Sequence, residues 1–495
     1  MQMGKRTGLA IAALMAASAS AAHAQTNCAS LKELRFPNVR IQEASTINEP
    51  VAHCKVTGVI GKELNFAVWL PEKWNGKFVM GGQGGFAGAV ESQAIGMMNA
   101  LAKGYATAGT DTGHSGTVAG GAWALGDMER IVNYAHTSIH SVSELGKATV
   151  SARYGRPADK SYFAGCSNGG RQALMAAQRY PDDFDGIIAG APVVDFVGVA
   201  AADVLVTAKM YPDPTNLSAP VLNKIDREAL GRAALAKCDK LDGLEDGIMT
   251  DPRKCQFEAK TLACKGPNKD GCLSPAELAA VEAIVIGPRE GNKIYHPPFP
   301  WGGEAFDAGW GRWMAGTRDA VAPGVPSLFY GFGVGFMRYF VMQDPKWDYR
   351  TLNLATLGKT AELIQKTLSP NNPDLSTFRA SGGKLLMYHG WSDSALTPLM
   401  STAYVDKVYG ADPASKSDVR LFMLPGVQHC SGGPGPFRID YLDALDKWVS
   451  GAAAPDELEA GFEDGRGARK VCAYPKLPVY GGTGDGKSPS QFVCK

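Results

Sequence analysis

The chain has 495 residues, of which 45% are hydrophobic and 20% are charged, and its formal net charge is +1. This length exceeds what one simple core usually contains, so we expect two globular parts or one core with a large insertion. A net charge this close to zero gives no broad field toward nucleic acid or anionic lipid, which argues against a nucleic-acid-binding protein.

The N-terminus has the pattern of a secretory signal peptide over residues 1–24. Lys5 and Arg6 precede an alanine-rich apolar run, and Ala22 and Ala24 place small residues at the two cleavage positions. The alternative is a membrane anchor, but the run is short for a span, and no later stretch is long and apolar enough to cross a bilayer. We therefore expect a soluble protein that is periplasmic or secreted, without stable membrane association.

Short apolar runs alternate with helical patterns through residues 25–196. Strands are predicted, in chain order, at 56–66, 77–81, 104–110, 161–165 and 186–190. Helices are predicted at about 139–154 and 171–180. Because strands alternate with helices, this segment is predicted to form the first part of a mostly parallel sheet covered on both faces.

The pattern changes after residue 196. Residues 197–375 are richer in Pro, Trp and Cys and have long irregular connections, with helices predicted near 220–237 and 275–285. The sheet pattern returns within 376–495, with strands at 384–388 and 420–424 and a helix near 438–450. We interpret 197–375 as a lid domain inserted between the two parts of the core.

The segment GCSNG at residues 165–169 fits the G-x-S-x-G motif and lies between a predicted strand and a predicted helix. This context favours Ser167 as a nucleophile, because a tight turn lifts the hydroxyl clear of the backbone and the flanking glycines admit close approach. The alternative is a purely structural turn. Together with the interrupted sheet, the motif predicts an α/β-hydrolase fold with a large inserted lid domain.

A serine nucleophile needs a base, and in this fold the chain order is serine, acid, histidine. Three histidines follow Ser167. His296 lies in a proline-bound loop of the predicted lid, and His389 ends a predicted strand, where a core histidine is the simpler interpretation. His429 follows the last predicted core strand and is the predicted base.

The acid is expected in the loop after the preceding core strand. Asp393 lies there, five residues beyond Tyr388, and it would accept the imidazole Nδ1–H and stabilise the imidazolium. Asp412 is the alternative. Ser167, Asp393 and His429 therefore form the predicted catalytic triad.

An oxyanion hole needs two backbone N–H donors. One is expected from the residue after the nucleophile, Asn168, and the other from the glycine-rich loop at 81–85, where Gly84 and Gly85 are the candidates. The alternatives for this loop are a simple tight turn or a phosphate cradle. No G-K-[ST] follows it, which argues against nucleotide binding.

All ten cysteines lie beyond the predicted signal peptide. An even number in an exported protein indicates a disulfide framework, and the absence of a C-x-x-C pair disfavours zinc. Cys166 precedes Ser167 and Cys430 follows His429. A disulfide between these two cysteines would hold nucleophile and base together, whereas two unrelated buried cysteines are the alternative.

These motifs resemble the tannase and feruloyl esterase family, which also contains mono(2-hydroxyethyl) terephthalate hydrolase. The resemblance covers nearly the whole mature chain and is carried by GCSNGG at 165–170, HGWSD at 389–393, QHC at 428–430, the glycine loop and the cysteine pattern. It implies four further disulfides, Cys28–Cys54, Cys238–Cys255, Cys264–Cys272 and Cys472–Cys494.

Residues 239–248 carry three aspartates and two glycines. Closely spaced carboxylates suit Ca²⁺, although the acid that an EF-hand has at its twelfth position is missing, and spacing alone leaves calcium and a solvated acidic turn equally open. The resemblance implies a structural calcium in the lid, with the matching ligands Asp239, Asp242 and Asp246 and the carbonyls of Leu244 and Ile248. No organic cofactor is expected.

Aromatic residues are dense between residues 310 and 340. Most would form lid core, while one or two, with Trp310 and Phe329 as candidates, could stack on an aromatic acyl group beside Leu396. The resemblance implies a serine carboxylesterase for small esters of phenolic acids such as ferulate or gallate. Terephthalate or phthalate half-esters are the alternative, but the stretch 327–336 offers no arginine for their free carboxylate before Arg338. An inactive binding protein with the same fold is the non-enzymatic alternative.

Overall fold

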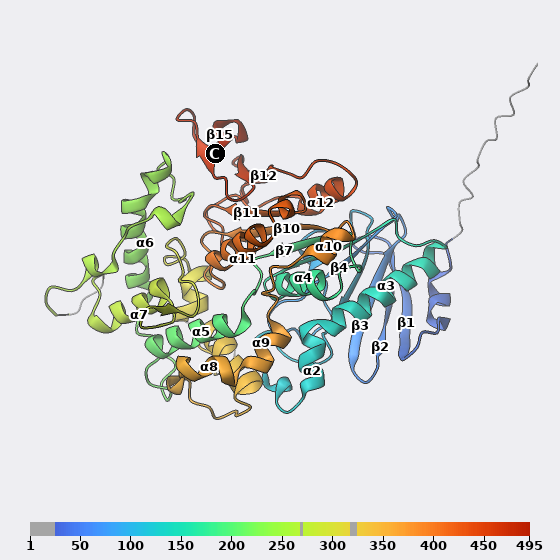
Figure 1. Cartoon of the computed structure of the whole chain (residues 1–495), viewed down its shortest axis with the longest axis horizontal. Coiled ribbons are helices and arrows are strands. Elements are labelled where there is room, and N and C mark those ends of the chain that lie inside the picture. Colours follow the sequence, from blue (N-terminus) through green and yellow to red (C-terminus); the bar gives the residue numbers. More distant parts are fainter. Residues whose placement is uncertain (1–24, 268–270, 317–323) are drawn as a thin grey trace, which may run out of the picture.

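The computed structural model describes residues 25–495 except 268–270 and 317–323 (Figure 1). The predicted signal peptide, residues 1–24, lies outside the described residues. Within the described ranges, no helix has the length and apolar character needed to cross a membrane.

The centre of the molecule is a mixed nine-stranded sheet with the order β1-β2-β3-β5-β4-β6-β7-β10-β11. Its strands are β1 Val39–Ile47, β2 His53–Ile60, β3 Leu64–Pro71, β4 Lys77–Gly81, β5 Ala106–Thr110, β6 Lys160–Cys166, β7 Gly186–Gly190, β10 Lys384–Gly390 and β11 Val419–Leu424. Strands β1, β2, β3 and β5 pair antiparallel in sequence, and every pairing from β5 through β4, β6, β7 and β10 to β11 is parallel.

The helices are α1 Gln93–Gly96, α2 Met128–Val132, α3 Ser138–Tyr154, α4 Asn168–Arg179, α5 Phe196–Met210, α6 Lys224–Cys238, α7 Pro275–Ile286, α8 Leu354–Thr360, α9 Glu362–Leu368, α10 Ser376–Ala380, α11 Pro398–Ala411 and α12 Tyr441–Val449. Three two-stranded antiparallel sheets lie outside the main sheet in the described ranges, formed by β8 Arg289–Glu290 with β9 Lys293–Ile294, β12 Glu457–Gly461 with β13 Ala468–Cys472, and β14 Pro478–Tyr480 with β15 Phe492–Cys494.

Both faces of the sheet are covered, which confirms the predicted fold class. Along β4, Phe78 and Met80 belong to one buried hydrophobic cluster and Val79 belongs to another. Helices α3, α4 and α11 contribute to the first cluster, and α1 and α12 to the second. Because successive strand residues face opposite sides, two apolar faces require two layers of helices.

The predicted strand 56–66 is in fact two strands. Residues 56–60 end β2, and β3 begins at Leu64. Gly61 has φ +60°, a left-handed conformation that glycine adopts without strain and that reverses the chain here. Strand β1 was not predicted, because its sequence VRIQEASTI is polar and its residues are exposed or half-buried at the sheet edge.

The segment predicted as a lid follows directly after β7. Its helix α5 bridges two clusters, since Phe196 and Val204 lie in the core cluster of the sheet, whereas Val206 and Met210 lie in a third cluster with α6 and α7. Figure 1 shows α5, α6, α7 and α8 grouped beside one end of the sheet. The domain boundaries at 196/197 and 375/376 stay a prediction.

Candidate active site

Ser167 lies at a sharp turn between β6 and α4. It has φ +64° and ψ −125°, a conformation that side chains rarely adopt, and its amide donates a 3.0 Å hydrogen bond to the Gly190 carbonyl. A Cβ atom at Gly165 would lie 2.6 Å from the backbone of Gly169. The two glycines of the motif are therefore required by the close packing of the turn, as expected for an exposed nucleophile.

Asp393 and His429 form the acid–imidazole pair of the site. Asp393 Oδ2 accepts a 2.8 Å hydrogen bond from His429 Nδ1, and its Oδ1 accepts the backbone N–H groups of Ala395 and Leu396 at 2.8 and 3.0 Å. Burial alone would raise the pKa of Asp393, but the charge of His429 and the hydrogen bonds from His389 and His429 hold this pKa well below its usual range. The carboxyl therefore stays ionised beside the imidazole.

His389 also contacts the acid, which the sequence did not indicate. Its Nε2 lies 3.1 Å from Asp393 Oδ2 and 3.0 Å from the Leu396 carbonyl, and its Nδ1 lies 2.8 Å from Ser401 Oγ. The side chain is fully buried. The only sequence signal is the four-residue spacing to Asp393, which by itself has no chemical meaning.

The two rival residues lie elsewhere. His296 is buried in the lid, where both ring nitrogens lack a hydrogen-bond partner among the described residues. Asp412 forms an ion pair with Arg379 at the end of α11. Neither lines the pockets at Ser167.

Ser167 and His429 line the same outer pocket, and their neighbours Cys166 and Cys430 are bonded with a Cα–Cα distance of 6.0 Å. The Trp313 ring stands edge-on to the His429 ring at 5.0 Å. Within the described part of the chain, His429 is hydrogen-bonded to Asp393 and no hydrogen bond joins it to Ser167 Oγ. Such contacts often tighten only when substrate binds.

All five disulfides have the pairing that the resemblance implies. Besides Cys166–Cys430, the structure contains Cys28–Cys54, Cys238–Cys255, Cys264–Cys272 and Cys472–Cys494. Within the described ranges no cysteine is free.

The glycine loop after β4 lies against the nucleophile turn. Gly85 lines both pockets with Ser167, and Gly84 lines the outer one. The backbone N–H of Gln83 donates a 3.0 Å hydrogen bond to Gln172 Oε1, and Asn168 Nδ2 donates a 3.0 Å hydrogen bond to the Gln83 carbonyl. In residues 25–495 as described, the amides of Gly84 and Gly85 donate no hydrogen bond, so they are free to meet an oxyanion.

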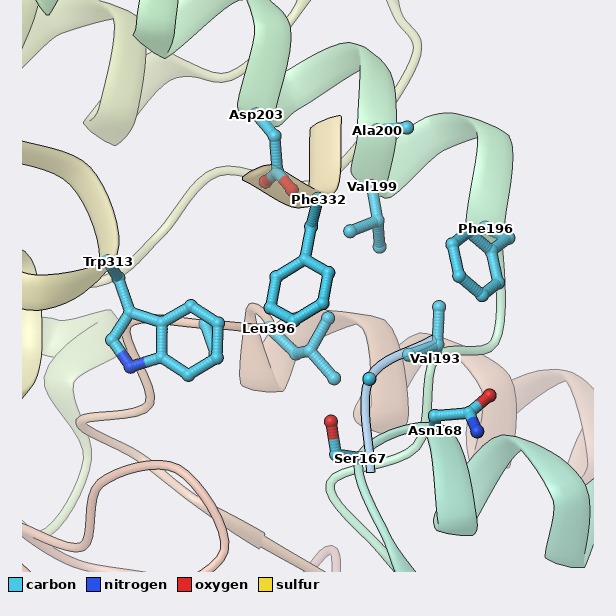
Figure 2. A pocket seen from close by; sticks show the side chains of 12 residues that line it. Ser167, Asn168, Val193, Phe196, Val199, Ala200, Asp203, Trp313, Phe332 and Leu396 are labelled. Atoms are coloured by element: carbon cyan, nitrogen blue, oxygen red, sulfur yellow. The ribbon is translucent and has the colours of Figure 1, made fainter. Parts of the chain in front are cut away.

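An inner pocket extends from Ser167 toward helix α5 (Figure 2). Leu396 lines it, as expected from the sequence, together with Phe196, Trp313 and Phe332. Asp203, which the sequence gave no reason to select, lines it too.

Trp310 and Phe329 do not line either pocket at Ser167. Both are buried in the lid cluster, where Trp310 stacks with Trp301 at 6.0 Å and Phe329 packs against Phe299 at 5.7 Å. Trp313, three residues beyond Trp310, faces the site because the π-helix Asp307–Ala315 turns the two rings in different directions. Composition alone could not separate these aromatic residues.

The acidic loop 239–248 is held by hydrogen bonds to its own backbone and by an ion pair to Arg469. Asp239 accepts the Gly247 amide, Asp242 accepts the Thr250 amide at 3.0 Å, and Asp246 pairs with Arg469. Burial raises the pKa of Asp239, and the neighbouring carboxylates Asp246 and Asp242 raise it further. Over the described ranges, no three His, Cys, Asp or Glu side chains are arranged to hold a metal ion.

Comparisons with known proteins show the family to which the chain belongs. The family model for tannase and feruloyl esterase matches residues 49–495. The chain is 33% identical to the mono(2-hydroxyethyl) terephthalate hydrolase of Piscinibacter sakaiensis, over 89% of the chain and 84% of that protein. It is also 33% identical to a probable feruloyl esterase of Arthroderma benhamiae, over 92% of the chain and 86% of the relative.

The fold is shared with a solved structure of feruloyl esterase B from Aspergillus oryzae, with a TM-score of 0.83, 26% identity, and coverage of 94% of this chain and 99% of that structure. The expected family resemblance is confirmed. The chain is a carboxylic ester hydrolase and belongs to the tannase and feruloyl esterase family.

Proposed function

We propose that the protein is an exported serine esterase that hydrolyses esters of phenolic acids through Ser167, His429 and Asp393. The observation that carries this proposal is the 2.8 Å hydrogen bond between His429 and Asp393 at a pocket that Ser167 also lines. A buried carboxylate that stays ionised fixes the imidazole tautomer and stabilises the imidazolium formed during the reaction.

In the proposed reaction, His429 Nε2 takes the proton of Ser167 Oγ as the oxygen attacks the ester carbonyl carbon. The amides of Asn168 and of Gly84 or Gly85 stabilise the resulting oxyanion. The bond to the alcohol oxygen then breaks, and His429 protonates the departing alcohol. Water, deprotonated by His429, attacks the acyl-enzyme, which releases the acid and restores Ser167.

The two pockets suggest where each half of the ester lies. His429 lines the outer pocket and not the inner one. Because His429 must protonate the leaving alcohol, the alcohol belongs in the outer pocket and the acyl group in the inner one. The inner pocket has aromatic and aliphatic walls, including Phe196, Phe332 and Val199, which suit a flat aromatic acid.

Export is proposed from the N-terminal pattern and from the disulfides. Five disulfides need an oxidising compartment, because cytosolic reductants keep thiols reduced.

A structural calcium in the lid is proposed as well. The support is chemical. Burial raises the pKa of Asp239, the neighbouring carboxylates Asp246 and Asp242 raise it further, and a hard cation relieves such repulsion. Asp239, Asp242, Asp246 and the carbonyls of Leu244 and Ile248 would supply oxygen ligands and order the lid, without a part in the reaction.

Terephthalate half-esters are the second candidate substrate, favoured by the similarity to mono(2-hydroxyethyl) terephthalate hydrolase. Their free carboxylate would require a cation at the far end of the acyl pocket. Among the described residues, the inner pocket has no arginine or lysine in its lining, Arg338 is engaged with the Trp347 carbonyl, and Arg312 lines only the outer pocket. Phenolic esters therefore fit better. The non-enzymatic alternative is not supported, because the family consists of esterases.

The test is a hydrolysis panel of methyl ferulate, methyl gallate and mono(2-hydroxyethyl) terephthalate with wild type and Ser167→Ala. We expect hydrolysis of the phenolic esters, with a loss of several orders of magnitude in kcat, of about 10⁴-fold or more, for Ser167→Ala. Near-normal activity in that variant would refute the assignment of the nucleophile.

A further inference from the structure

The inner pocket contains one polar group that the proposed reaction does not use. Asp203, on helix α5, is only 3% exposed, and its Oδ1 atom is buried without a hydrogen-bond partner among the described residues. Figure 2 shows its carboxyl group extending from α5 toward the pocket, with Ser167 at the opposite end. A buried polar group without a partner is rare in native proteins and calls for a functional reason.

No structural role accounts for this carboxyl. Burial raises its pKa well above the ordinary value, which favours the neutral acid form of the carboxyl. Val199 and Ala200, one helical turn before it, are apolar, and Gly333 lies so close that a Cβ there would be 2.4 Å from Asp203 Cβ. An alanine or leucine at 203 would suit the surroundings of the helix better than an aspartate.

Among the described residues that line the pocket, Asp203 is the one acidic or basic side chain. The walls are formed by Val193, Phe196, Val199, Phe332 and Leu396. At the other end, the Asn168 side chain is already used, because its Nδ2 donates to the Gln83 carbonyl and its Oδ1 accepts from Arg171 Nε. A flat acyl group whose carbonyl reaches Ser167 would therefore point its far edge toward Asp203.

We propose that Asp203 determines specificity by hydrogen-bonding a ring hydroxyl of a phenolic acyl group bound in the inner pocket. This inference rests on the proposed function and adds the group that selects the substrate. A neutral carboxyl can both donate to and accept from a neutral phenol, so the pair is satisfied without burying a charge. A substrate carboxylate at this position would be buried beside a carboxyl with no cation, which is unfavourable.

The test compares methyl 4-hydroxycinnamate with methyl cinnamate, which lacks only the ring hydroxyl. We expect the wild type to prefer the hydroxylated ester in kcat/KM by about 10- to 100-fold. Asp203→Leu should abolish this preference, because its kcat/KM on the hydroxylated ester falls. Asp203→Asn should keep most of the preference, because its amide also donates and accepts.

Thr207→Val is the matched control. Thr207 lies one turn further along α5 and also has a buried hydroxyl without a partner in the described part of the chain, but it does not line the pocket. This variant should keep the full preference. Hydrolysis of p-nitrophenyl acetate, whose acyl group is too short to reach Asp203, is measured alongside, and its kcat/KM in Asp203→Leu should fall far less than that of methyl 4-hydroxycinnamate.

An unchanged preference in Asp203→Leu, which means equal losses of kcat/KM on the two cinnamates, would overturn the inference. Ser167→Ala keeps the two proposals apart, since loss of all esterase activity in that variant supports the proposed function whatever happens at Asp203.

Discussion

Cys166 and Cys430 form a disulfide across 264 residues of sequence, and this bond joins the residue before Ser167 to the residue after His429. The nucleophile turn after β6 and the histidine loop after β11 are thereby covalently linked, although β7 and β10 lie between these strands in the sheet. The link restricts how far the proposed nucleophile and base can move apart.

Removal of this disulfide should affect catalysis more than removal of another one. We expect Cys166→Ala/Cys430→Ala to lower kcat by about 10- to 100-fold, because a displacement near 1 Å misaligns the reacting groups. In the chain-entropy view, this long loop also contributes about 5 kcal/mol to the free energy of unfolding. The control is Cys472→Ala/Cys494→Ala, remote from the pockets, which should lower Tm but leave kcat near wild type. Similar kcat values in both double variants would contradict this role.

His389 should act as a positioning residue through its contact with Asp393. We expect His389→Gln to lower kcat by about 10- to 100-fold with KM little changed, because a shifted carboxylate misorients His429. Ser401→Ala, which removes only the partner of His389 Nδ1, should cause a smaller loss in kcat. Steady-state kinetics give kcat and KM for each variant, and thermal melts give Tm. A drop in Tm with kcat unchanged would mean that His389 is purely structural.

The glycine loop should tolerate no side chain at Gly85. This residue has φ +50°, and a Cβ there would lie 2.4 Å from the Val118 carbonyl oxygen. We expect Gly85→Ala to displace the oxyanion donors and lower kcat by about 10²- to 10³-fold. Gly96→Ala is the matched control, since a Cβ at Gly96 meets no atom within 4 Å. A fully active Gly85→Ala enzyme would exclude this loop from the oxyanion hole.

The pH dependence of stability should reveal the buried Asp203. Burial raises its pKa well above the ordinary value. The unfolded chain ionises the group at about pH 4, whereas the folded protein keeps the proton, so the stability contributed by this group falls as pH rises above that point.

Asp203→Asn removes this penalty. The variant should exceed wild type in free energy of unfolding by about 1–3 kcal/mol near pH 8, and the difference should shrink toward pH 4. Thermal melts at both pH values measure it. A difference that is constant with pH would show that ionisation of Asp203 has no part in it.

Calcium should stabilise the lid without entering the reaction. We expect added Ca²⁺ to raise Tm and a chelator to lower it. The free energy of unfolding should rise by about 2.7 kcal/mol when Ca²⁺ is at a hundredfold excess over Kd. Asp242→Asn should weaken this response. Asp251→Asn should keep it, because Asp251 lies in the same disulfide loop but is not a proposed ligand. A Tm that is insensitive to both Ca²⁺ and chelator would refute the calcium proposal.

The sequence by itself determined the fold class and the family, and it predicted Ser167, Asp393 and His429 as the triad. Each follows from a local feature that can be read along the sequence. These features are the G-x-S-x-G motif, the order of strands and helices, and an acid or a histidine in the loop after a core strand. For the same reason, the hairpin between β2 and β3 was missed, because two adjoining strands and one long strand have the same apolar pattern.

Only the tertiary structure decided which side chains surround these groups. It brought His389 to Asp393, turned Trp313 and Phe332 toward Ser167 while burying Trp310 and Phe329 in the lid, and left Asp203 at the far end of the pocket. The physical reason is that a side chain's surroundings depend on helix rotation and on contacts between distant segments, which residue type and spacing do not encode.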